Sequence, residues 1–303
     1  MTDLSKEILD KYQIRKSAAQ KQAFAAFLQS KIPEMTVQSE GFPKNNNLII
    51  GSPEKAQVIL GAHYDTCARM PLPNFITPLN PLLSVVYSIV LMIPIFLVVF
   101  LLNFILSAFT DDFFIHYFVS VLCMFGLLAL MIVGPANKCT VNDNTSGVIT
   151  LCEIYAHLPS NLKETVAFVF FDNEEKGLFG SSAFRKKYKK QLNDKILINF
   201  DCVSDGDHVL LAANKNVRAK YGEIIESIFT ATEEKKILFK HIEKVYYPSD
   251  QAGFPNAVAI AALNYKKGIG YYMDKIHTKK DTVMDERNIT YLRDRVIQLL
   301  ERI

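Results

Sequence analysis

The sequence predicts an α/β fold, a central mixed, mostly parallel sheet flanked by helices, with a two-helix hairpin inserted into it. Three short apolar runs, VILGAH, AFVFFDNEE and ILINFD, each end in polar residues. Runs of this composition are typical of strands that are buried on both faces of an α/β sheet. Two much longer apolar runs fill the stretch between Arg69 and Lys138, which contains no other Lys or Arg. The chain therefore combines a sheet domain with a segment of a different kind.

The expected elements alternate along the chain. Residues 5–30 carry apolar side chains at helical spacing, and strands are expected at 34–40, 47–50 and 57–62. After the hairpin we expect a helix at 147–156, strands at 165–171 and 195–200 around a basic helix at 181–191, a helix at 219–230, strands at 237–240 and 258–263, and a final helix at 286–302. This alternation favours a mainly parallel sheet that is covered on both faces. We expect residues 1–78 and 135–303 to form one domain, with 79–134 inserted.

The inserted segment has the length and composition of two membrane spans. The apolar runs at 82–106 and 113–134 each exceed the roughly 20 residues that a helix needs to cross ~30 Å of hydrocarbon. Only six residues, 107–112, join them, and these include Asp111 and Asp112. Neither run has a polar face, so the sequence predicts a transmembrane hairpin. The alternative is a pair of buried helices in a soluble core.

The distribution of charge indicates on which side of the membrane the sheet domain lies. The N-terminus is charged and amphipathic and has no apolar core of the signal-peptide type. All 34 Lys and Arg lie outside the spans and their link, so the positive-inside rule predicts an integral membrane protein with its main domain in the cytoplasm. Five cysteines without paired spacing fit a reducing compartment. A net charge of +3 indicates no nucleic-acid partner.

Metal-ligand side chains follow several of the expected strands. Polar residues at the carboxyl ends of parallel strands meet at one edge of a sheet. Two imidazoles and three carboxylates can hold two zinc ions, with one carboxylate bridging and positions left open for water. The sequence therefore predicts metal-assisted hydrolysis and two Zn²⁺ ions. The five candidate ligands are His63, Asp143, Glu175, Asp201 and His277.

Two further carboxylates are candidates for catalytic roles. Glu174 and Glu175 stand side by side, and their repulsion must be offset by cations or by a shared proton. One of them can bind a metal while the other acts as general base on water. Asp65 lies two residues after His63, on the same side of a strand, and can accept the far imidazole N–H. Asp281 can serve His277 in the same way.

Each of these residues, taken alone, also fits an ordinary structural role. His63 and Asp65 can be a structural pair, and Asp143, in the turn-rich NDNTSG, can simply cap a helix. Adjacent glutamates are common at exposed strand ends. Cys67 and Cys202 adjoin site residues, but five ligands already suffice, so we expect both to be small buried side chains.

Six motifs together make the chain similar to a known family. They are GAHYDT, NDNTSG, FFDNEEKGLFGS, INFD, YPSDQAGFP and HTKKDT, and they span roughly residues 15–303. In order and context they resemble the co-catalytic di-zinc exopeptidases, which include bacterial leucyl aminopeptidases, plasma glutamate carboxypeptidase and the glutaminyl cyclases. The resemblance implies a central mixed sheet of about eight strands between helices.

The resemblance also implies a role for each matching residue. It places His63 and Asp201 on one zinc ion, Glu175 and His277 on the other, and Asp143 between them. Glu174 would be the general base that takes a proton from the attacking water, while the zinc ions polarise the scissile carbonyl. Asp65 would orient the first histidine.

The chain departs from the family at two places. Gln251 stands where many relatives have a histidine, which bears on substrate specificity if that position contacts substrate. The hairpin replaces a short loop, and its connections, at 71–81 and 135–142, lie between His63 and Asp143. Both spans are therefore expected to begin close to the site. One interpretation is a site that opens toward the bilayer and acts on membrane-delivered or amphipathic peptides; the other is a mere anchor or an oligomerisation surface.

The leading hypothesis is a membrane-anchored zinc aminopeptidase that acts on peptides, with the bilayer as its other partner and its oligomeric state open. A glutaminyl-cyclase-like acyltransferase is the first alternative. Those relatives typically work with one zinc ion and line the substrate pocket with tryptophan, and this chain has no Trp. Carboxypeptidase or dipeptidase activity stays open, and a non-catalytic binding domain is the alternative from another class.

Overall fold

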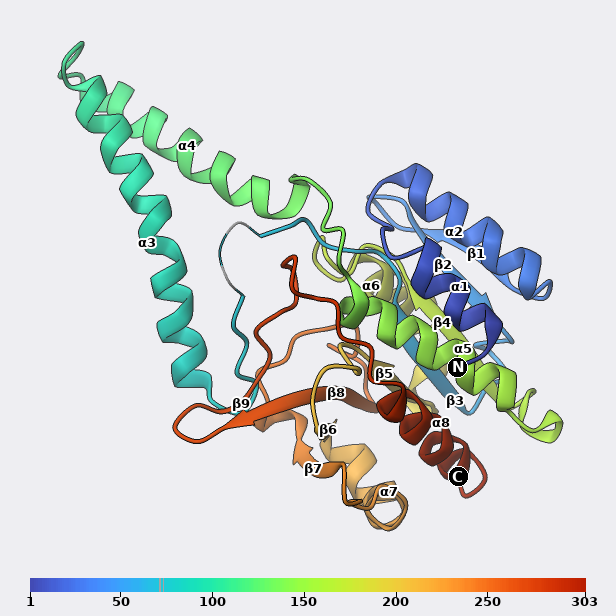
Figure 1. Cartoon of the computed structure of the whole chain (residues 1–303). Coiled ribbons are helices and arrows are strands. Elements are labelled where there is room, and N and C mark those ends of the chain that lie inside the picture. The colour runs from blue at the N-terminus through green and yellow to red at the C-terminus, as the bar shows by residue number, and fades with distance from the viewer. Residues whose placement is uncertain (71, 73) are drawn as a thin grey trace.

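The structure is a computed structural model, and it describes every residue of the chain except 71 and 73. In the described residues, nine strands form one sheet in the order β1-β2-β4-β3-β5-β8-β6-β7, with β9 paired to β8 (Figure 1). Their bounds are β1 Thr36–Glu40, β2 Asn45–Ile50, β3 Val58–His63, β4 Val166–Phe171, β5 Ile196–Phe200, β6 His208–Ala213, β7 Lys236–His241, β8 Ala257–Lys266 and β9 Gly270–Tyr272.

The centre of the sheet is parallel and its margins are antiparallel. β3 pairs in parallel with both β4 and β5, and β5 pairs in parallel with β8. β2 runs antiparallel to β4, and β6 runs antiparallel to β8. The carboxyl ends of β4, β3 and β5 therefore lie next to one another at one edge, and the predicted α/β class with a mixed sheet is confirmed.

Helices and loops bury both faces of the sheet. Along β3 the apolar side chains alternate: Leu60 enters the large core and Ile59 the smaller one on the opposite face. The large core lies under α1 Asp3–Lys11, α2 Ala18–Lys31, α5 Gly147–His157, α7 Lys215–Ile228 and α8 Glu286–Leu300. The smaller core includes Phe184 of α6 Phe179–Lys187. Every residue of β3, β4 and β5 is buried, which explains why their sequences are almost wholly apolar.

Three elements differ from the sequence prediction. The stretch expected to be helical at 5–30 is two helices, because the chain breaks at 12–17 and buries Arg15 there. Strand β6 was not predicted; its HVLLAA is a short apolar run that spacing alone does not distinguish from a buried helix segment. Strand β9 has three residues, too few to give a periodic signal.

The inserted hairpin projects from the sheet domain (Figure 1). It consists of α3 Pro81–Leu106 and α4 Phe113–Val133, which start at the capping side chains of Asn80 and Asp112. By length and composition both helices are able to cross a membrane. Their most apolar windows are not buried at all in the structure, so the alternative of two core helices does not fit.

Both ends of the hairpin lie beside the residues that the sequence marks as the site. Ala68, before α3, forms an antiparallel bridge with Ala136, after α4. The amide of Met70 donates to the carbonyl oxygen of His277 at 2.9 Å. The connection expected at 71–81 includes residues 71 and 73, which lie outside the described part of the chain.

Candidate metal centre

Three adjacent parallel strands bring four of the predicted residues to one edge of the sheet. His63 is the last residue of β3, Asp201 directly follows β5, and Glu174 and Glu175 stand in the turn after β4. Because β3 lies between β4 and β5, its imidazole is flanked by carboxylates from both sides. Nε2 of His63 lies 3.5 Å from Oδ1 of Asp201.

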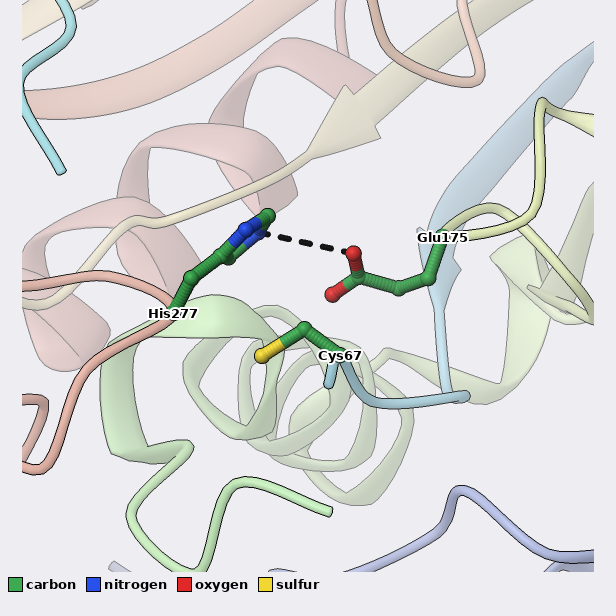
Figure 2. Close-up of side chains that lie close together, drawn as sticks. All are labelled: Cys67, Glu175 and His277. Atoms are coloured by element: carbon green, nitrogen blue, oxygen red, sulfur yellow. Dashed lines mark ion pairs between the residues drawn. The ribbon is translucent and has the colours of Figure 1, made fainter. Parts of the chain in front are cut away.

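Two loops supply the remaining candidates. Asp143 precedes α5, and His277 lies in the loop after β9. Oδ1 of Asp143 lies 3.3 Å from Nε2 of His63, and its Oδ2 lies 2.8 Å from Nε2 of His277. Nε2 of His277 is also 3.4 Å from Oε2 of Glu175 (Figure 2). The structure thus brings all five predicted ligands together, with Asp143 placing one oxygen on each imidazole.

The loop that carries Asp143 is held on both sides. The carboxylate of Asp281 accepts hydrogen bonds from the amides of Asn142 (2.7 Å) and Asp143 (3.0 Å). The amide side chain of Asn144 accepts from the backbone of Cys202 at 3.2 Å and donates to the carbonyl of Phe200 at 2.9 Å. The prediction gave Asp281 a role at His277, whereas in the structure its carboxylate oxygens bind the Asp143 loop.

Asp65 also makes contacts that the sequence did not predict. Its carboxylate accepts hydrogen bonds from the amides of Glu174 (2.9 Å) and Glu175 (3.3 Å). Nδ1 of His63 is closer to the backbone oxygen of Asp65, at 3.1 Å, than to its Oδ1, at 3.7 Å. In the neutral imidazole, a hydrogen bond from Nδ1 to that carbonyl leaves Nε2 without a proton and facing Asp143 and Asp201.

The site concentrates negative charge that the protein itself does not neutralise. Oε1 of Glu175 is buried without a hydrogen-bond partner in the described part of the chain. Buried polar atoms are normally paired, so an unpaired carboxylate oxygen among these ligand-type side chains points to a cation beside it. Imidazole and carboxylate are donors that divalent transition metals accept. The residues present therefore fit a metal centre.

The pKa values of the site show the same excess of negative charge. Burial raises the pKa of Glu175 to about 8. Burial, opposed by His63 and reinforced by Glu175, raises the pKa of Glu174 well above its usual value. Burial lowers the pKa of His277, but the carboxylates of Glu175 and Asp143 outweigh it and raise the value to about 10. Without a cation, protons take its place.

Cys67 lies closer to the centre than the sequence indicated. As expected it is a small buried side chain, but its sulfur and ligand atoms of Glu175 and His277 all lie within 4.8 Å of one another (Figure 2). Burial, followed by the charges of Glu175 and Asp143, raises the pKa of its thiol well above the usual value. Cys202 is likewise buried, and its sulfur lies 3.2 Å from Oδ1 of Asp201.

Two functional neighbours were missed from the sequence. Asp250, in YPSDQAGFP, is fully buried, and burial raises its pKa to about 7. It is electrostatically coupled to Glu174 and His63. The motif YPSDQAGFP was noted in the sequence because of Gln251. The acidic residue directly before Gln251 was the signal that could have identified Asp250. Arg15 is the other residue, and no signal marked it, because a single arginine in a helical pattern is usually exposed.

Arg15 connects two backbone segments that carry site residues, the one after His63 and the loop of Asp143. Its guanidinium is fully buried and donates from Nε to the carbonyl of Tyr64 at 2.5 Å and from Nη1 to Oγ1 of Thr145 at 3.2 Å. It also donates to the carbonyl of Tyr12. Burial lowers its pKa to about 10. One side chain therefore connects the residue after His63 to the loop that carries Asp143.

Gln251, which departs from the family pattern, is an internal residue. It is buried; its Oε1 accepts from Asn199 of β5 at 3.0 Å and its Nε2 donates to the carbonyl of Tyr247 at 2.8 Å. Both ends of the side chain are thus occupied by the protein.

Three residues at the site adopt a left-handed backbone conformation: Asn173, before the glutamate pair, Cys202 and His277. Such conformations are strained for residues other than glycine, and they cluster at functional sites.

Comparisons with known proteins agree with this geometry. Peptidase family M28 matches residues 127–299, more than half of the chain. No curated protein matches the sequence. The LapA aminopeptidase of Legionella pneumophila is 12% identical over 98% of this chain and 69% of its own, with a TM-score of 0.57. Glutaminyl cyclase of Porphyromonas gingivalis is 16% identical over 99% and 97% (TM-score 0.56), and PhTET1-12s is 14% identical over 99% of both chains (TM-score 0.51). These structures share the fold.

Proposed function

Because the chain belongs to peptidase family M28, a family of peptide hydrolases, we propose that it is a membrane-anchored, zinc-dependent exopeptidase, and most specifically an aminopeptidase. The observation that carries this proposal is the position of Asp143 between His63 and His277, with one carboxylate oxygen on each. A carboxylate placed in this way can bridge two metal ions. Structural neighbours with the same fold include an aminopeptidase.

The residues divide into two sets around Asp143. His63 and Asp201 would hold one zinc ion, and Glu175 and His277 the other. When bound, the zinc ions polarise the scissile carbonyl and make water more acidic. Two further carboxylates hold these residues in place. Asp65 accepts a hydrogen bond from the backbone amide of Glu174, and Asp281 accepts one from the backbone amide of Asp143.

Glu174 is the proposed general base. It shares a cluster of ligand-type atoms with His63 and Asp201, all within 4.8 Å of one another. Its carboxylate would take the proton of the attacking water and pass it to the leaving amine. In the metal-free protein, burial raises the pKa of this carboxyl well above its usual range.

The hairpin supplies the proposed location. We place α3 and α4 in the bilayer and the sheet domain on the cytoplasmic side, because the basic residues lie outside both helices and the link between them has none. The bridge between Ala68 and Ala136 puts the membrane-proximal ends of both helices beside the site. Peptides that arrive at the membrane surface, or that are themselves amphipathic, would therefore reach it most readily.

The test compares the wild type with Glu174→Gln in detergent. Aminoacyl-nitroanilides and short peptides are offered while bound metal is measured by mass spectrometry, and Glu164→Gln, an exposed glutamate, is the matched control. We expect Glu174→Gln to lose about 10²- to 10⁴-fold in kcat with its metal content unchanged. Unchanged activity in Glu174→Gln, or no turnover by metal-loaded wild type, would overturn the proposal. A peptide with N-terminal glutamine is included, since loss of ammonia without chain shortening would identify cyclase activity instead.

A further inference from the structure

A large apolar cavity lies between the two hairpin helices. Figure 1 shows α3 and α4 joined at the tip and diverging toward the sheet domain. The cavity has a volume of about 710 Å³, within the ~300–1,000 Å³ range of small-molecule sites. Its apolar wall includes Leu91, Met92 and Ile95 of α3 and Leu127, Leu128 and Met131 of α4. Only an apolar ligand fits such a wall.

Polar contacts hold the two helices together near the tip of the hairpin, away from the cavity. Asn103 of α3 donates to Oγ of Ser120 of α4 at 2.7 Å, and its Oδ1 lies 2.8 Å from Nδ1 of His116. None of these residues lines the cavity. The helices are therefore fixed to each other at the tip and separated at the base, and the cavity lies in the part of the hairpin nearest the sheet domain.

The cavity ends at a basic surface. Arg69 and Met70 line it and also line an adjoining cavity of about 180 Å³, which Lys279 and Lys280 share. Among the described residues of that lining, Asp274 is the one that is acidic. In the described part of the chain, none of the three basic side chains forms an ion pair with an acidic residue. An excess of unpaired cations at the end of an apolar cavity matches a ligand with an apolar chain and an anionic head.

We infer that the cavity holds one acyl chain of an anionic phospholipid, with the phosphate at Arg69, Lys279 and Lys280. The inference rests on the proposed position of the hairpin in the bilayer, where such lipids are present around both helices. A free phosphate would leave the apolar wall unfilled, and an apolar helix would leave the cations unpaired. Long basic side chains at the membrane surface reach headgroups in this way.

The bound lipid would touch the segments that build the metal centre. The amide of Met70 donates to the carbonyl of His277, and Lys279 and Lys280 lie between His277 and Asp281 in the sequence. Asn137, after α4, donates from its side chain to the carbonyl of Thr278 at 3.0 Å. A lipid at this position therefore supports the loop that carries His277 from its membrane side.

The test uses the full chain in phosphatidylcholine vesicles that contain a phosphatidylglycerol with a photoreactive group in its acyl chain. The labelled residues are then mapped by mass spectrometry. We expect label on the cavity wall, reduced at least about tenfold in Leu91→Trp/Leu127→Trp, whose added rings fill the cavity. Leu97→Trp/Leu122→Trp, two exposed hairpin positions outside the cavity, is the matched control and should label like the wild type.

A second pair of variants tests the anionic head. Replacing Arg69, Lys279 and Lys280 by Gln should lower the preference for phosphatidylglycerol over a phosphatidylcholine probe at least about tenfold. Lys189→Gln/Lys190→Gln, on an exposed basic stretch, should leave it unchanged. Equal labelling inside and outside the cavity, or no preference for the anionic probe, overturns the lipid site alone. Absence of label anywhere on the hairpin overturns the proposed membrane position as well, and cross-links between two chains at the cavity identify a second copy as the occupant.

Discussion

The carboxylate of Asp65 accepts hydrogen bonds from the backbone amides of Glu174, at 2.9 Å, and of Glu175, at 3.3 Å. These bonds connect the end of β3 to the turn after β4 across two adjacent strands. The residue two positions after His63 thus sets where both glutamates stand. Asp281 makes the same kind of paired contact with the loop of Asp143, so two buried acids position four backbone amides around the centre.

Asp65→Asn should therefore weaken activity through the position of Glu174. An amide retains one acceptor oxygen but presents an NH₂ group to the second backbone N–H, which leaves one donor unpaired. Changes of supporting residues around metal ligands typically cost about 10- to 100-fold in activity or metal affinity. Steady-state kinetics and bound metal measure both effects. Activity within twofold of wild type would show that the turn is held without Asp65.

Asp250→Asn should move the pH dependence of kcat/KM. The charge of Asp250 raises the pKa of Glu174. Removal of that charge lowers the pKa, so the base becomes deprotonated at lower pH and the acidic limb moves to lower pH, by up to about one unit. Asp194→Asn, an exposed acid, is the control. An acidic limb that stays in place or moves upward would contradict this coupling.

After removal of the metal, the protein should become less stable as the pH rises. The pKa of Glu175 rises from 4.5 to about 8 on folding, and that of His277 from 6.5 to about 10. Between its unfolded and its folded pKa, each group binds more protons in the folded state than in the unfolded state. Each group therefore makes its full contribution to stability at pH values below its unfolded pKa. That stability is lost as pH rises through the folded pKa, at up to about 1.4 kcal/mol per pH unit and net proton.

Thermal unfolding of chelator-treated protein from pH 5 to 9 checks this. Metal binding requires deprotonated ligands, so the stabilisation that added zinc gives should be largest above pH 7. Asp143→Asn, which lacks the central carboxylate, serves as the control and should respond little to zinc. A metal-free protein that becomes more stable toward pH 9 would contradict the assigned pKa shifts.

Arg15→Met should destabilise the whole domain. The buried guanidinium binds the backbone oxygen of Tyr64 and the hydroxyl of Thr145, and its loss leaves these acceptors without a donor. Breaking a buried polar network of this kind costs roughly 2–4 kcal/mol. Arg287→Gln, whose side chain is 65% exposed, should cost less than about 1 kcal/mol. Denaturant unfolding compares the two, and equal effects would show that Arg15 has no special role.

The hairpin link should be shielded from the cytoplasm. A protease cleavage site inserted at residues 107–112 should resist cleavage in sealed inside-out vesicles and be cut once detergent opens them. A site inserted at the exposed turn of residues 267–269, between β8 and β9, should be cut at once. The opposite pattern would place the sheet domain on the other side of the membrane.

The family and the fold were predictable from the sequence because they depend on motifs and on wholly apolar strands. The predictions that the chain resembles zinc exopeptidases and forms a mixed α/β sheet are confirmed. His63 and Asp201 were found because they end or directly follow such strands, and Glu174 and Glu175 because they stand as a pair shortly after one. Their metal and catalytic roles stay predictions that the variants above test.

What the sequence did not reveal depends on contacts between distant segments. The partners of Asp65 lie 109 and 110 residues away, so its local spacing suggested only a contact with His63. Arg15 is buried because three separate segments converge on it, and no local pattern records that. Strand β6 was missed because HVLLAA becomes a strand only through its pairing with β7 and β8.

The bridge between Ala68 and Ala136 bears on how such a protein arises. The chain leaves the sheet domain and returns to it through paired neighbours, although more than sixty residues separate them in sequence. In the sheet domain, the whole hairpin therefore takes the place of a single loop. An ancestor with a short turn here would need no change at His63 or Asp143 to acquire it. Excision of the proposed membrane hairpin between these two alanines is therefore the natural design for a water-soluble version of the protein.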